Sequence, residues 1–320
     1  MRDVAQRAGV SLKTVSRVIN AEAGVTPSTA AKVTDAIDAL GFERNDLARS
    51  LRQGRSSATL GLVIEDVANP FYSAVAQAVE AAASDRGFLL ITASALEDAE
   101  RERELIGALL RRRVDALLIV PAGPDHRYIS DSARTVFLDR PPQGIAADTV
   151  LLDNLGGARR AVEHLIAHGH TRIGCVADSA ELYTVRERLA GYREALRAAG
   201  IEEDPALVMS GNRDAIASQI AAERLLDEHR PTALFAANNR NTVGVLHALA
   251  DRERSVALVG FDDFELADLL GTTVIRADPW RLGEQAAALA FARLDGDDRP
   301  PLEITVPTEL IARGSGEVAA

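Results

Sequence analysis

The chain contains a single cysteine and no long apolar segment, and both absences restrict what the protein can be. Cys175 cannot form an internal disulfide, and no cysteine pair is available to bind zinc. No apolar run approaches the roughly 18 residues that a membrane helix needs. The first residues also lack the basic start and apolar core of a secretory signal. We therefore expect a cytoplasmic protein with no membrane association, and a buried strand position for Cys175 within 173–176.

Sequence motifs for catalysis are also missing. The chain has no Gly-x-Ser-x-Gly turn and no phosphate-binding loop that ends in Gly-Lys-Ser or Gly-Lys-Thr. A metal site is the alternative interpretation of His164, His168 and His170, which lie close together in the sequence. The Gly between the last two fits the end of a helix better, and no carboxylate is obviously supplied. We expect no enzymatic activity, no metal and no cofactor.

Length and charge indicate several domains with different partners. At 320 residues the chain is too long for one average domain, so two or three units are expected. The net charge of −11 is unevenly distributed: residues 1–58 carry nine basic and six acidic side chains, a net charge of +3, which leaves −14 for the remainder. Any surface that binds nucleic acid is therefore confined to the N-terminal segment.

The first twenty residues contain two short helical patterns on either side of a tight turn. Gly9 can adopt the left-handed conformation that ends a helix, and Ser11 can cap the next helix. Apolar residues at helical spacing can form a small core between the two helices: Val4, Ala5, Ala8, Val15, Val18 and Ile19. The pattern predicts a helix, a turn and a helix.

The second of these helices has a polar face that can donate hydrogen bonds and carries no carboxylate. Lys13, Ser16, Arg17 and Asn20 recur at three- and four-residue spacing on this face. Arginine and lysine can bind guanine edges or phosphates, and asparagine can pair with adenine. The face is typical of a DNA recognition helix, although an ordinary amphipathic helix with a solvated face is the alternative.

A third helix is predicted after Thr26-Pro27, a capping residue followed by proline at the first helical position. Val33, Ile37 and Leu40 have helical spacing and complete the small core, and Gly41 is placed to end the helix. Residues 42–57 that follow are polar, and taken alone they are best interpreted as a linker.

From residue 59 the pattern alternates between strands and helices. Continuous apolar strands joined by helical crossovers indicate doubly wound parallel sheets, and two such α/β units in series form a cleft. The predicted strands are Leu60–Ile64, Phe88–Ile91, Ala116–Val120, Arg172–Val176, Ala233–Ala236 and Ala257–Phe261. The predicted helices are Tyr72–Arg86, Asp98–Arg111, Leu155–Ala167, Arg186–Ala199 and Ile216–Asp227.

Polar residues at the ends of these strands are candidates for binding a small hydroxylated ligand. Asp139 and Asp262 each follow an apolar strand, so their carboxylates can accept hydrogen bonds from neighbouring hydroxyls. Arg188 can donate and Asn238 can do both. An aromatic ring at Phe71 or Tyr72 can stack on a sugar-like face. For any one of these positions, a solvated loop-end charge or a helix cap is the alternative.

Several segments together resemble the LacI/GalR family of transcriptional regulators. They include Asp3-Val4-Ala5, Ala8-Gly9-Val10-Ser11 and Thr14-Val15-Ser16-Arg17-Val18-Ile19-Asn20, and later Asp66-Val67-Ala68-Asn69-Pro70-Phe71-Tyr72 and Val259-Gly260-Phe261-Asp262-Asp263. The resemblance implies a helix-turn-helix DNA-binding headpiece at 1–44 and a hinge helix with linker at 45–57. It also implies a periplasmic-binding-protein-like effector and dimerisation domain at 58–320, divided into subdomains of about 58–150 plus 277–306 and about 151–276 plus 307–320.

The resemblance also assigns residues to the two sites. Those implied to bind DNA are Ser11, Leu12, Lys13, Thr14, Ser16, Arg17 and Asn20 in the headpiece, with Asn45, Ala48 and Leu51 in the hinge. Leu51 matches an apolar wedge that partly unstacks a base step. Those implied to bind the effector are Phe71, Tyr72, Asp139, Arg140, Thr184, Arg188, Asn238 and Asp262. Arg44 stands where many members have proline, which loosens the entry to the hinge.

The function that the resemblance implies is a ligand-responsive repressor on operator DNA, acting as a homodimer or as a tetramer of two dimers. The effector would be a sugar, a sugar phosphate or a nucleobase-like compound. Departures from the family pattern at Asn239, Ala277 and Arg213 favour a phosphorylated or acidic effector over a neutral sugar. A solute-binding protein of a transport system is the alternative, but it leaves residues 1–57 unexplained.

Overall fold

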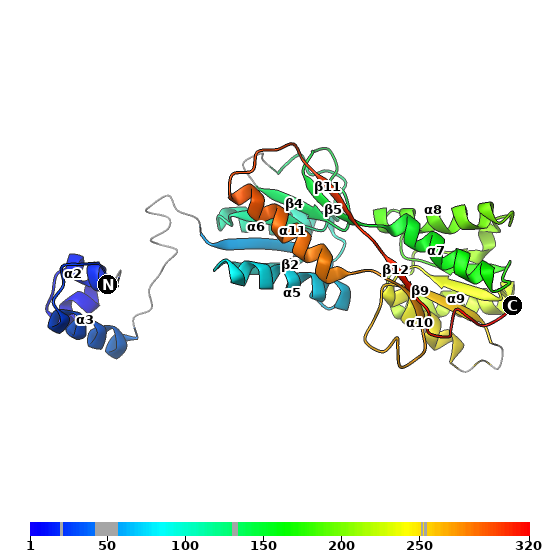
Figure 1. Cartoon of the computed structure of the whole chain (residues 1–320), viewed down its shortest axis with the longest axis horizontal. Helices are drawn as coiled ribbons and strands as arrows, with labels where there is room; N and C mark the ends of the chain where they lie inside the picture. Colours follow the sequence, from blue (N-terminus) through cyan, green and yellow to red (C-terminus); the bar gives the residue numbers. More distant parts are fainter. Residues whose placement is uncertain (20–21, 42–56, 130–133, 251, 253–254) are drawn as a thin grey trace. The chain divides into compact units, whose positions relative to one another are not determined.

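The structure is a computed structural model that describes residues 1–19, 22–41, 57–129, 134–250, 252 and 255–320. The chain forms two compact units, Met1–Ser57 and Ala58–Ala320, and Figure 1 draws the elements of both. We call them the N-terminal unit and the C-terminal unit and describe each by itself.

The N-terminal unit contains three short helices, α1 (Arg2–Ala8), α2 (Leu12–Ile19) and α3 (Pro27–Leu40). Gly9 ends α1 in the left-handed conformation with a φ of 66°, which a residue without a side chain adopts at little cost. The Ser11 hydroxyl accepts a 3.1 Å hydrogen bond from the Thr14 amide and so caps α2. The predicted helix, turn and helix are confirmed.

The core of this unit differs from the prediction in its third helix. Val4, Val15 and Val33 are fully buried, one from each helix. Leu40, expected in the core, is exposed, and Ala36 is buried in its place. Leu40 shares the face of Val33 and Ile37, but it is the last residue of α3, where the helix extends past the small core.

The C-terminal unit contains two six-stranded sheets, and we call the part built on each sheet its first and second half. The first sheet is entirely parallel in the order β11-β5-β4-β3-β1-β2. Its strands are β1 (Thr59–Ile64), β2 (Leu89–Ser94), β3 (Ala116–Ile119), β4 (Thr135–Leu138), β5 (Asp148–Leu152) and β11 (Glu303–Val306).

The second sheet has the order β12-β10-β9-β8-β6-β7, and β12 is its one antiparallel strand. Its strands are β6 (Ile173–Val176), β7 (Val208–Met209), β8 (Ala233–Ala236), β9 (Ala257–Phe261), β10 (Thr273–Arg276) and β12 (Glu309–Ile311). Cys175 lies fully buried in β6 as predicted. Burial raises the pKa of its thiol to about 12, so the thiol stays protonated and unreactive at neutral pH.

Helices cover both faces of each sheet, which is the doubly wound arrangement that the sequence predicts (Figure 1). The first sheet packs against α5 (Pro70–Asp85) and α11 (Pro279–Leu294) on one face and against α6 (Ala99–Arg111) on the other. The second sheet packs against α7 (Asn154–Ala167) and α8 (Tyr183–Ala198) on one face. Its other face packs against α9 (Ala215–Arg224) and α10 (Asn239–Leu249), with a 3-10 turn at Pro205–Leu207 and a π turn at Leu225–His229.

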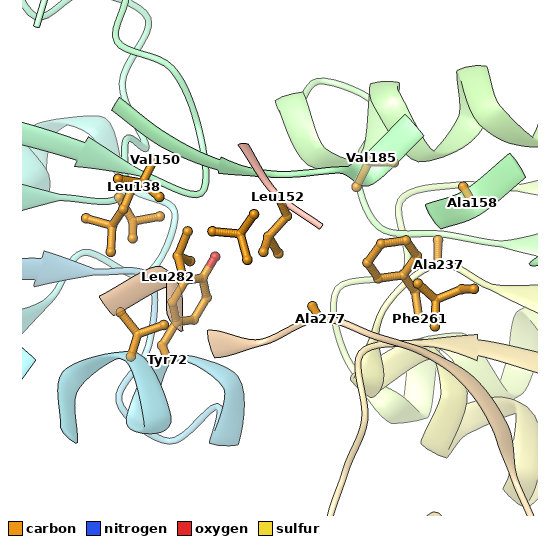
Figure 2. Packing of buried hydrophobic residues seen from close by; sticks show 14 of the residues in the cluster. Tyr72, Leu138, Val150, Leu152, Ala158, Val185, Ala237, Phe261, Ala277 and Leu282 are labelled. Carbon is orange, nitrogen blue, oxygen red and sulfur yellow. The ribbon is translucent and has the colours of Figure 1, made fainter. Parts of the chain in front are cut away.

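The chain crosses between the two halves three times: after β5, after β10, and between β11 and β12. The subdomain boundary implied near residue 150 lies inside β5, which ends at Leu152, so the first crossing follows Leu152. In Figure 2, Leu152 and Ala277 lie between the two halves, at two of these crossings. Three crossings between the same two halves can act as a hinge.

One buried cluster extends through both halves. Figure 2 shows Tyr72 rising from α5 toward Leu138 and Val150 in the first half, and Phe261 beside Ala237 in the second. The continuity of this cluster ties the two sheets together at the level of the strand ends. No helix among the described residues is long and apolar enough to cross a bilayer.

The strand predicted at Phe88–Ile91 is present, but it runs further along the chain and is more exposed than predicted. The observed β2 begins at Leu89 and continues to Ser94, and it lies at the edge of its sheet beside β1. Leu89 is 72% exposed and Ile91 is 37% exposed. An apolar run predicts a strand but does not distinguish a central strand from an edge strand, which leaves one flank uncovered.

Candidate functional site

The outward surface of α2 contains most of the side chains predicted to contact DNA. Val15 is the buried residue of this helix, whereas Ser11, Leu12 and Lys13 at its start are exposed. Thr14, Ser16 and Arg17 are partly exposed. The helix contains no acidic residue. The structure therefore leaves the basic and hydroxyl side chains of α2 accessible, as reading a groove requires.

The hydroxyl groups at the start of α2 are already organised by one another. The Ser11 and Thr14 hydroxyls are 2.9 Å apart. This contact restricts their rotamers before any ligand is bound, and it places two groups that can serve phosphate oxygens at a helix N-terminus. Four further predicted DNA contacts, Asn20, Asn45, Ala48 and Leu51, lie outside the described residues, as does Arg44, so those assignments stay predictions.

All eight predicted effector-binding residues line one cavity of about 50 Å³ in the C-terminal unit, which we call the inner cavity. They come from both halves of the unit: Phe71, Tyr72, Asp139 and Arg140 from the first, and Thr184, Arg188, Asn238 and Asp262 from the second. Two sheets joined by three crossings bring these residues together because their carboxyl strand ends face the same space.

Asp139 and Asp262 occupy equivalent places in the two halves. Each follows a central strand, β4 or β9, and each has a φ of 66°. Aspartate tolerates this left-handed conformation better than most residues, but at a cost of about 1–3 kcal/mol. The conformation turns both carboxyl groups away from their strands and into the inner cavity.

Asp262 has a carboxylate oxygen that is buried without a partner. Its Oδ2 lies 3.5 Å from Arg188 Nη1, but Oδ1 is enclosed and accepts no hydrogen bond among the described residues. Burial raises the pKa of this carboxyl group, partly offset by the charge of Arg188. A buried acceptor without a donor is costly, so Asp262 Oδ1 is placed to accept a hydrogen bond from a hydroxyl or amine of a ligand.

Arg188 is held rigidly beside this carboxyl group. It donates to Asn154 Oδ1 at 2.8 Å and to the Ala237 carbonyl at 2.6 Å. Its guanidinium carbon lies 3.7 Å from the centre of the Phe261 ring, a stacking contact that lysine could not reproduce. Arg188 therefore positions Asp262 and has little freedom to swing toward a ligand.

In the first half, Tyr72 and Arg140 lie beside Asp139. The Tyr72 hydroxyl donates a 2.8 Å hydrogen bond to Asp139 Oδ2, and burial together with that carboxylate raises the pKa of Tyr72, which stays a donor. Arg140 makes two hydrogen bonds to Glu97, at 2.7 and 2.5 Å. Arg140 Nε is buried without a hydrogen bond, 3.7 Å from Asp139 Oδ2.

Comparisons with known proteins agree with this architecture. Residues 1–45 match the bacterial regulatory proteins of the lacI family, and residues 162–316 match the periplasmic binding protein-like domain. The ribose operon repressor of Escherichia coli K12 is 32% identical over 98% of this chain and 99% of its own length. The chain belongs to the LacI family. The resemblance drawn from the sequence motifs is confirmed.

Solved structures of LacI family members have the same fold. The lac repressor dimer bound to operator and an anti-inducer superimposes with a TM-score of 0.85 at 26% identity, over 99% of this chain and 98% of that one. The regulator CelR in complex with cellobiose gives a TM-score of 0.74 at 32% identity, over 98% of each chain. The two-unit organisation of this LacI family chain is therefore shared along its whole length.

Sequence reasoning missed the residues that join the two halves of this LacI family chain. Arg240 on α10 donates to Glu65 at 3.1 Å and to Asp66 at 2.6 Å, and Asn239 donates to Asn69 at 2.8 Å. A signal was present, because Glu65 and Asp66 directly follow β1, in the same relation to their strand as Asp139 to β4. In the sequence, Asn239 stands out only as a departure from the family pattern.

A second and larger cavity adjoins the first. This outer cavity has a volume of about 450 Å³ and shares Glu97, Arg140 and Leu182 with the inner cavity. Arg213, which the sequence placed near a ligand, lies on its wall together with Arg186. Neither of these two arginines lines the inner cavity, so they belong to the outer one alone.

The three histidines considered for a metal site are used in packing contacts instead. His164 Nε2 contacts the Glu317 carboxylate, and His168 Nδ1 lies 2.8 Å from the His164 carbonyl. His170 is buried between Thr232 and the Val318 carbonyl. The described ranges contain no group of three or more His, Cys, Asp or Glu side chains arranged to hold a metal ion. The contacts of His164 and His170 fasten the C-terminal segment to the second half.

Proposed function

We propose that this LacI family protein is a ligand-responsive repressor that binds operator DNA through α2 and binds a small polyhydroxylated effector through residues that line the inner cavity. The observation that carries the effector assignment is the buried, unpartnered Asp262 Oδ1, an acceptor that the fold leaves for a ligand. Buried carboxylate oxygens are usually paired with a donor from the protein, from water or from a ligand.

On DNA, the start of α2 would enter the major groove. Lys13 and Arg17 project from the same face at helical spacing and would bind guanine edges or phosphates. Leu12, exposed at the first turn, would contact a thymine methyl group. The hinge residues Asn45, Ala48 and Leu51 would pair with their counterparts in a second subunit at the centre of the operator.

The effector would connect the two halves of the C-terminal unit. Tyr72 and Asp139 belong to one half and Asp262 and Asn238 to the other, so a ligand bound by all four stabilises the closed arrangement. Two relatives are a ribose operon repressor and the regulator CelR, whose solved complex holds cellobiose, and both support a carbohydrate-like effector. Because a ligand changes only the balance between states, its affinity for the two must differ.

The repressor would act as a homodimer, and the lac repressor bound to its operator is likewise a dimer. Apolar side chains are exposed in the C-terminal unit on β2, through Leu89 and Ile91, and on α9, through Ile216 and Ile220. These exposed apolar side chains would contribute to the dimer interface if they join into one patch on association. We assign the protein no catalytic role, because the relatives that match its full length are transcriptional regulators.

The proposal is tested by footprinting the full chain on the DNA upstream of its own gene, at a fixed salt concentration because phosphate contacts make affinity depend steeply on salt. We expect a protected, near-palindromic site whose occupancy changes when an effector is added. A solute-binding protein would protect no specific site, and that result would overturn the proposal.

A further inference from the structure

The inner cavity is rich in carboxylates whose basic neighbours are already engaged. Its walls contain five acidic side chains, Glu65, Glu97, Asp139, Asp178 and Asp262, and three arginines, Arg140, Arg188 and Arg240. Arg140 is bound to Glu97, Arg188 to Asn154 and the Ala237 carbonyl, and Arg240 to Glu65 and Asp66. The groups of the wall that stay free to bind a ligand are mainly hydrogen-bond acceptors, which can accept hydrogen bonds from hydroxyl groups.

The outer cavity offers the opposite chemistry. Arg213 is exposed, and no hydrogen bond or ion pair of its side chain occurs within the described part of the chain. Arg186 uses one guanidinium nitrogen to donate to the Glu181 carbonyl at 2.8 Å, and its guanidinium carbon lies 5.9 Å from the centre of the Tyr183 ring. Among the described residues its side chain makes no other hydrogen bond, and it lines the outer cavity. Of the two carboxylates on this wall, Glu97 is paired with Arg140, which leaves Glu181. Asp178 of the inner cavity is another carboxylate near Arg213; burial raises the Asp178 pKa, and the charge of Arg213 acts to lower it.

A buried donor stands where the two cavities meet. Arg140 lines both of them, its side chain is 7% exposed, and its Nε has no hydrogen-bond partner among the described residues. A buried N–H group without an acceptor is as costly as a buried acceptor without a donor. A ligand oxygen at the border between the two cavities would accept a hydrogen bond from Arg140 Nε.

The volumes of the two cavities decide where the bulk of a ligand can lie. The inner cavity, at about 50 Å³, holds little more than one water molecule, whose share of liquid volume is roughly 30 Å³. The outer cavity, at about 450 Å³, has room for a compound of monosaccharide size or larger. A ligand bound to this arrangement would reach the inner carboxylates with one end and fill the outer cavity with the rest.

We propose that the effector is a polyhydroxylated anion, a sugar phosphate or a sugar acid. Its hydroxyl groups bind Asp139 and Asp262, and its anionic group lies in the outer cavity against Arg186 and Arg213. This inference rests on the proposed function, because it names the chemical class of the same effector. Guanidinium groups bind phosphate and carboxylate oxygens with paired, charge-assisted hydrogen bonds. Both lysines of the chain lie within its first 32 residues, so arginine supplies this recognition throughout the C-terminal unit.

Isothermal calorimetry of the full chain with matched pairs of compounds tests this class. The pairs are D-ribose with D-ribose 5-phosphate, D-glucose with D-glucose 6-phosphate, and D-glucose with D-gluconate, so that phosphate and carboxylate are tested separately. We expect an anionic member to bind about 10- to 100-fold more tightly than its neutral partner, as a charged hydrogen bond allows. The proposal is overturned if the neutral sugars bind as tightly or if no anionic member binds.

Substitutions locate the anionic group. Arg213→Gln is expected to reduce the preference for the anionic compound to within about threefold of the neutral one, while Arg213→Lys retains part of it because the charge remains. Arg224→Gln is the matched control, since Arg224 is an exposed arginine of the same half that pairs with Glu228 and lines neither cavity. An unchanged preference in Arg213→Gln overturns the proposal.

A wild-type chain that protects its operator but binds only neutral sugars overturns the anionic class and leaves the repressor assignment standing. A chain that binds sugar phosphates but protects no specific DNA overturns the repressor assignment and leaves the anionic class of ligand standing.

Discussion

Arg240 donates a 2.6 Å hydrogen bond to Asp66 across the boundary between the two halves of the C-terminal unit. The same guanidinium lies 3.1 Å from the Glu65 carboxylate. The pKa of Glu65 is raised, and burial of the side chain is the largest cause. Arg240 and Glu65 line the inner cavity. The contact therefore joins the two halves in the absence of an effector. Closure of the two halves depends on this ion pair as well as on the ligand.

Arg240→Gln is predicted to loosen this closed arrangement. The ion pairs are partly exposed, so their loss shifts the balance between open and closed states by a modest amount, of order 1 kcal/mol or less. Hydrogen–deuterium exchange should become faster in the peptides around Asp66 and Asn239, about two- to fivefold if exchange follows that opening. Arg224→Gln should leave the exchange of both peptides unchanged. Equal exchange rates in wild type and Arg240→Gln would contradict the role of Arg240 in holding the two halves together.

Adjacent aspartates after β9 are predicted to have opposite effects on stability. Asp262 is buried with one oxygen unpartnered, whereas Asp263 makes two hydrogen bonds to Arg313, both 2.7 Å. Asp262→Asn should raise the free energy of unfolding at pH 7 by about 0.5–1 kcal/mol and abolish effector binding, since function is often maintained at a cost in stability. Asp263→Asn should lower it by about 1 kcal/mol. Urea unfolding of both variants measures this, and a loss of stability in Asp262→Asn would refute the role given to its free oxygen.

The pH dependence of stability follows from the raised pKa of Asp262. The folded state holds this proton more tightly than the unfolded state, so the stabilisation is fully present below the unfolded pKa of about 3.9 and is lost as the pH rises through the folded pKa. Ionised Asp262 therefore weakens the unliganded protein near neutral pH. The gain in stability from Asp262→Asn should be larger at pH 7 than at pH 4, and an identical gain at both would contradict this cause.

The exposed edge of the first sheet is predicted to stabilise the dimer. Leu89→Asp places a charge on an apolar position that is 72% exposed in the single chain, so folding should be little affected while association is weakened. Analytical ultracentrifugation should show at least a tenfold rise in the dimer dissociation constant, on the scale of a core interface residue. Leu302→Asp, a substitution at another exposed leucine, should not change the constant. A dimer of unchanged affinity in Leu89→Asp would place the interface elsewhere.

The strand ends of the two halves could be predicted from sequence, and the contacts between the halves could not. Asp139 and Asp262 follow apolar runs, so their place at the carboxyl edge of a sheet follows from the fold class. The pairing of Arg240 with Asp66 depends on how two sheets meet through three crossings, which no local pattern encodes. The exposed flank of β2 was missed for a similar reason, because burial of an apolar strand depends on its position in the sheet.

Loop conformation is the other feature that sequence patterns concealed. Leu96 and Glu97 both have a φ of 57°, an uncommon conformation for residues with a side chain. It brings Glu97 back to Arg140, which then stands at the border of the two cavities. The sequence marked Arg213 as unusual, but only the surrounding walls show that it lines a large cavity.

Footprinting of Arg17→Ala tests most directly whether α2 reads the operator. We predict that this variant, folded as judged by circular dichroism, loses specific protection by at least tenfold, because a bidentate contact to a base contributes about 1–3 kcal/mol. Lys32→Ala removes the same charge from an exposed position on α3 and should weaken binding only slightly. Specific protection by Arg17→Ala equal to that of wild type would contradict the account.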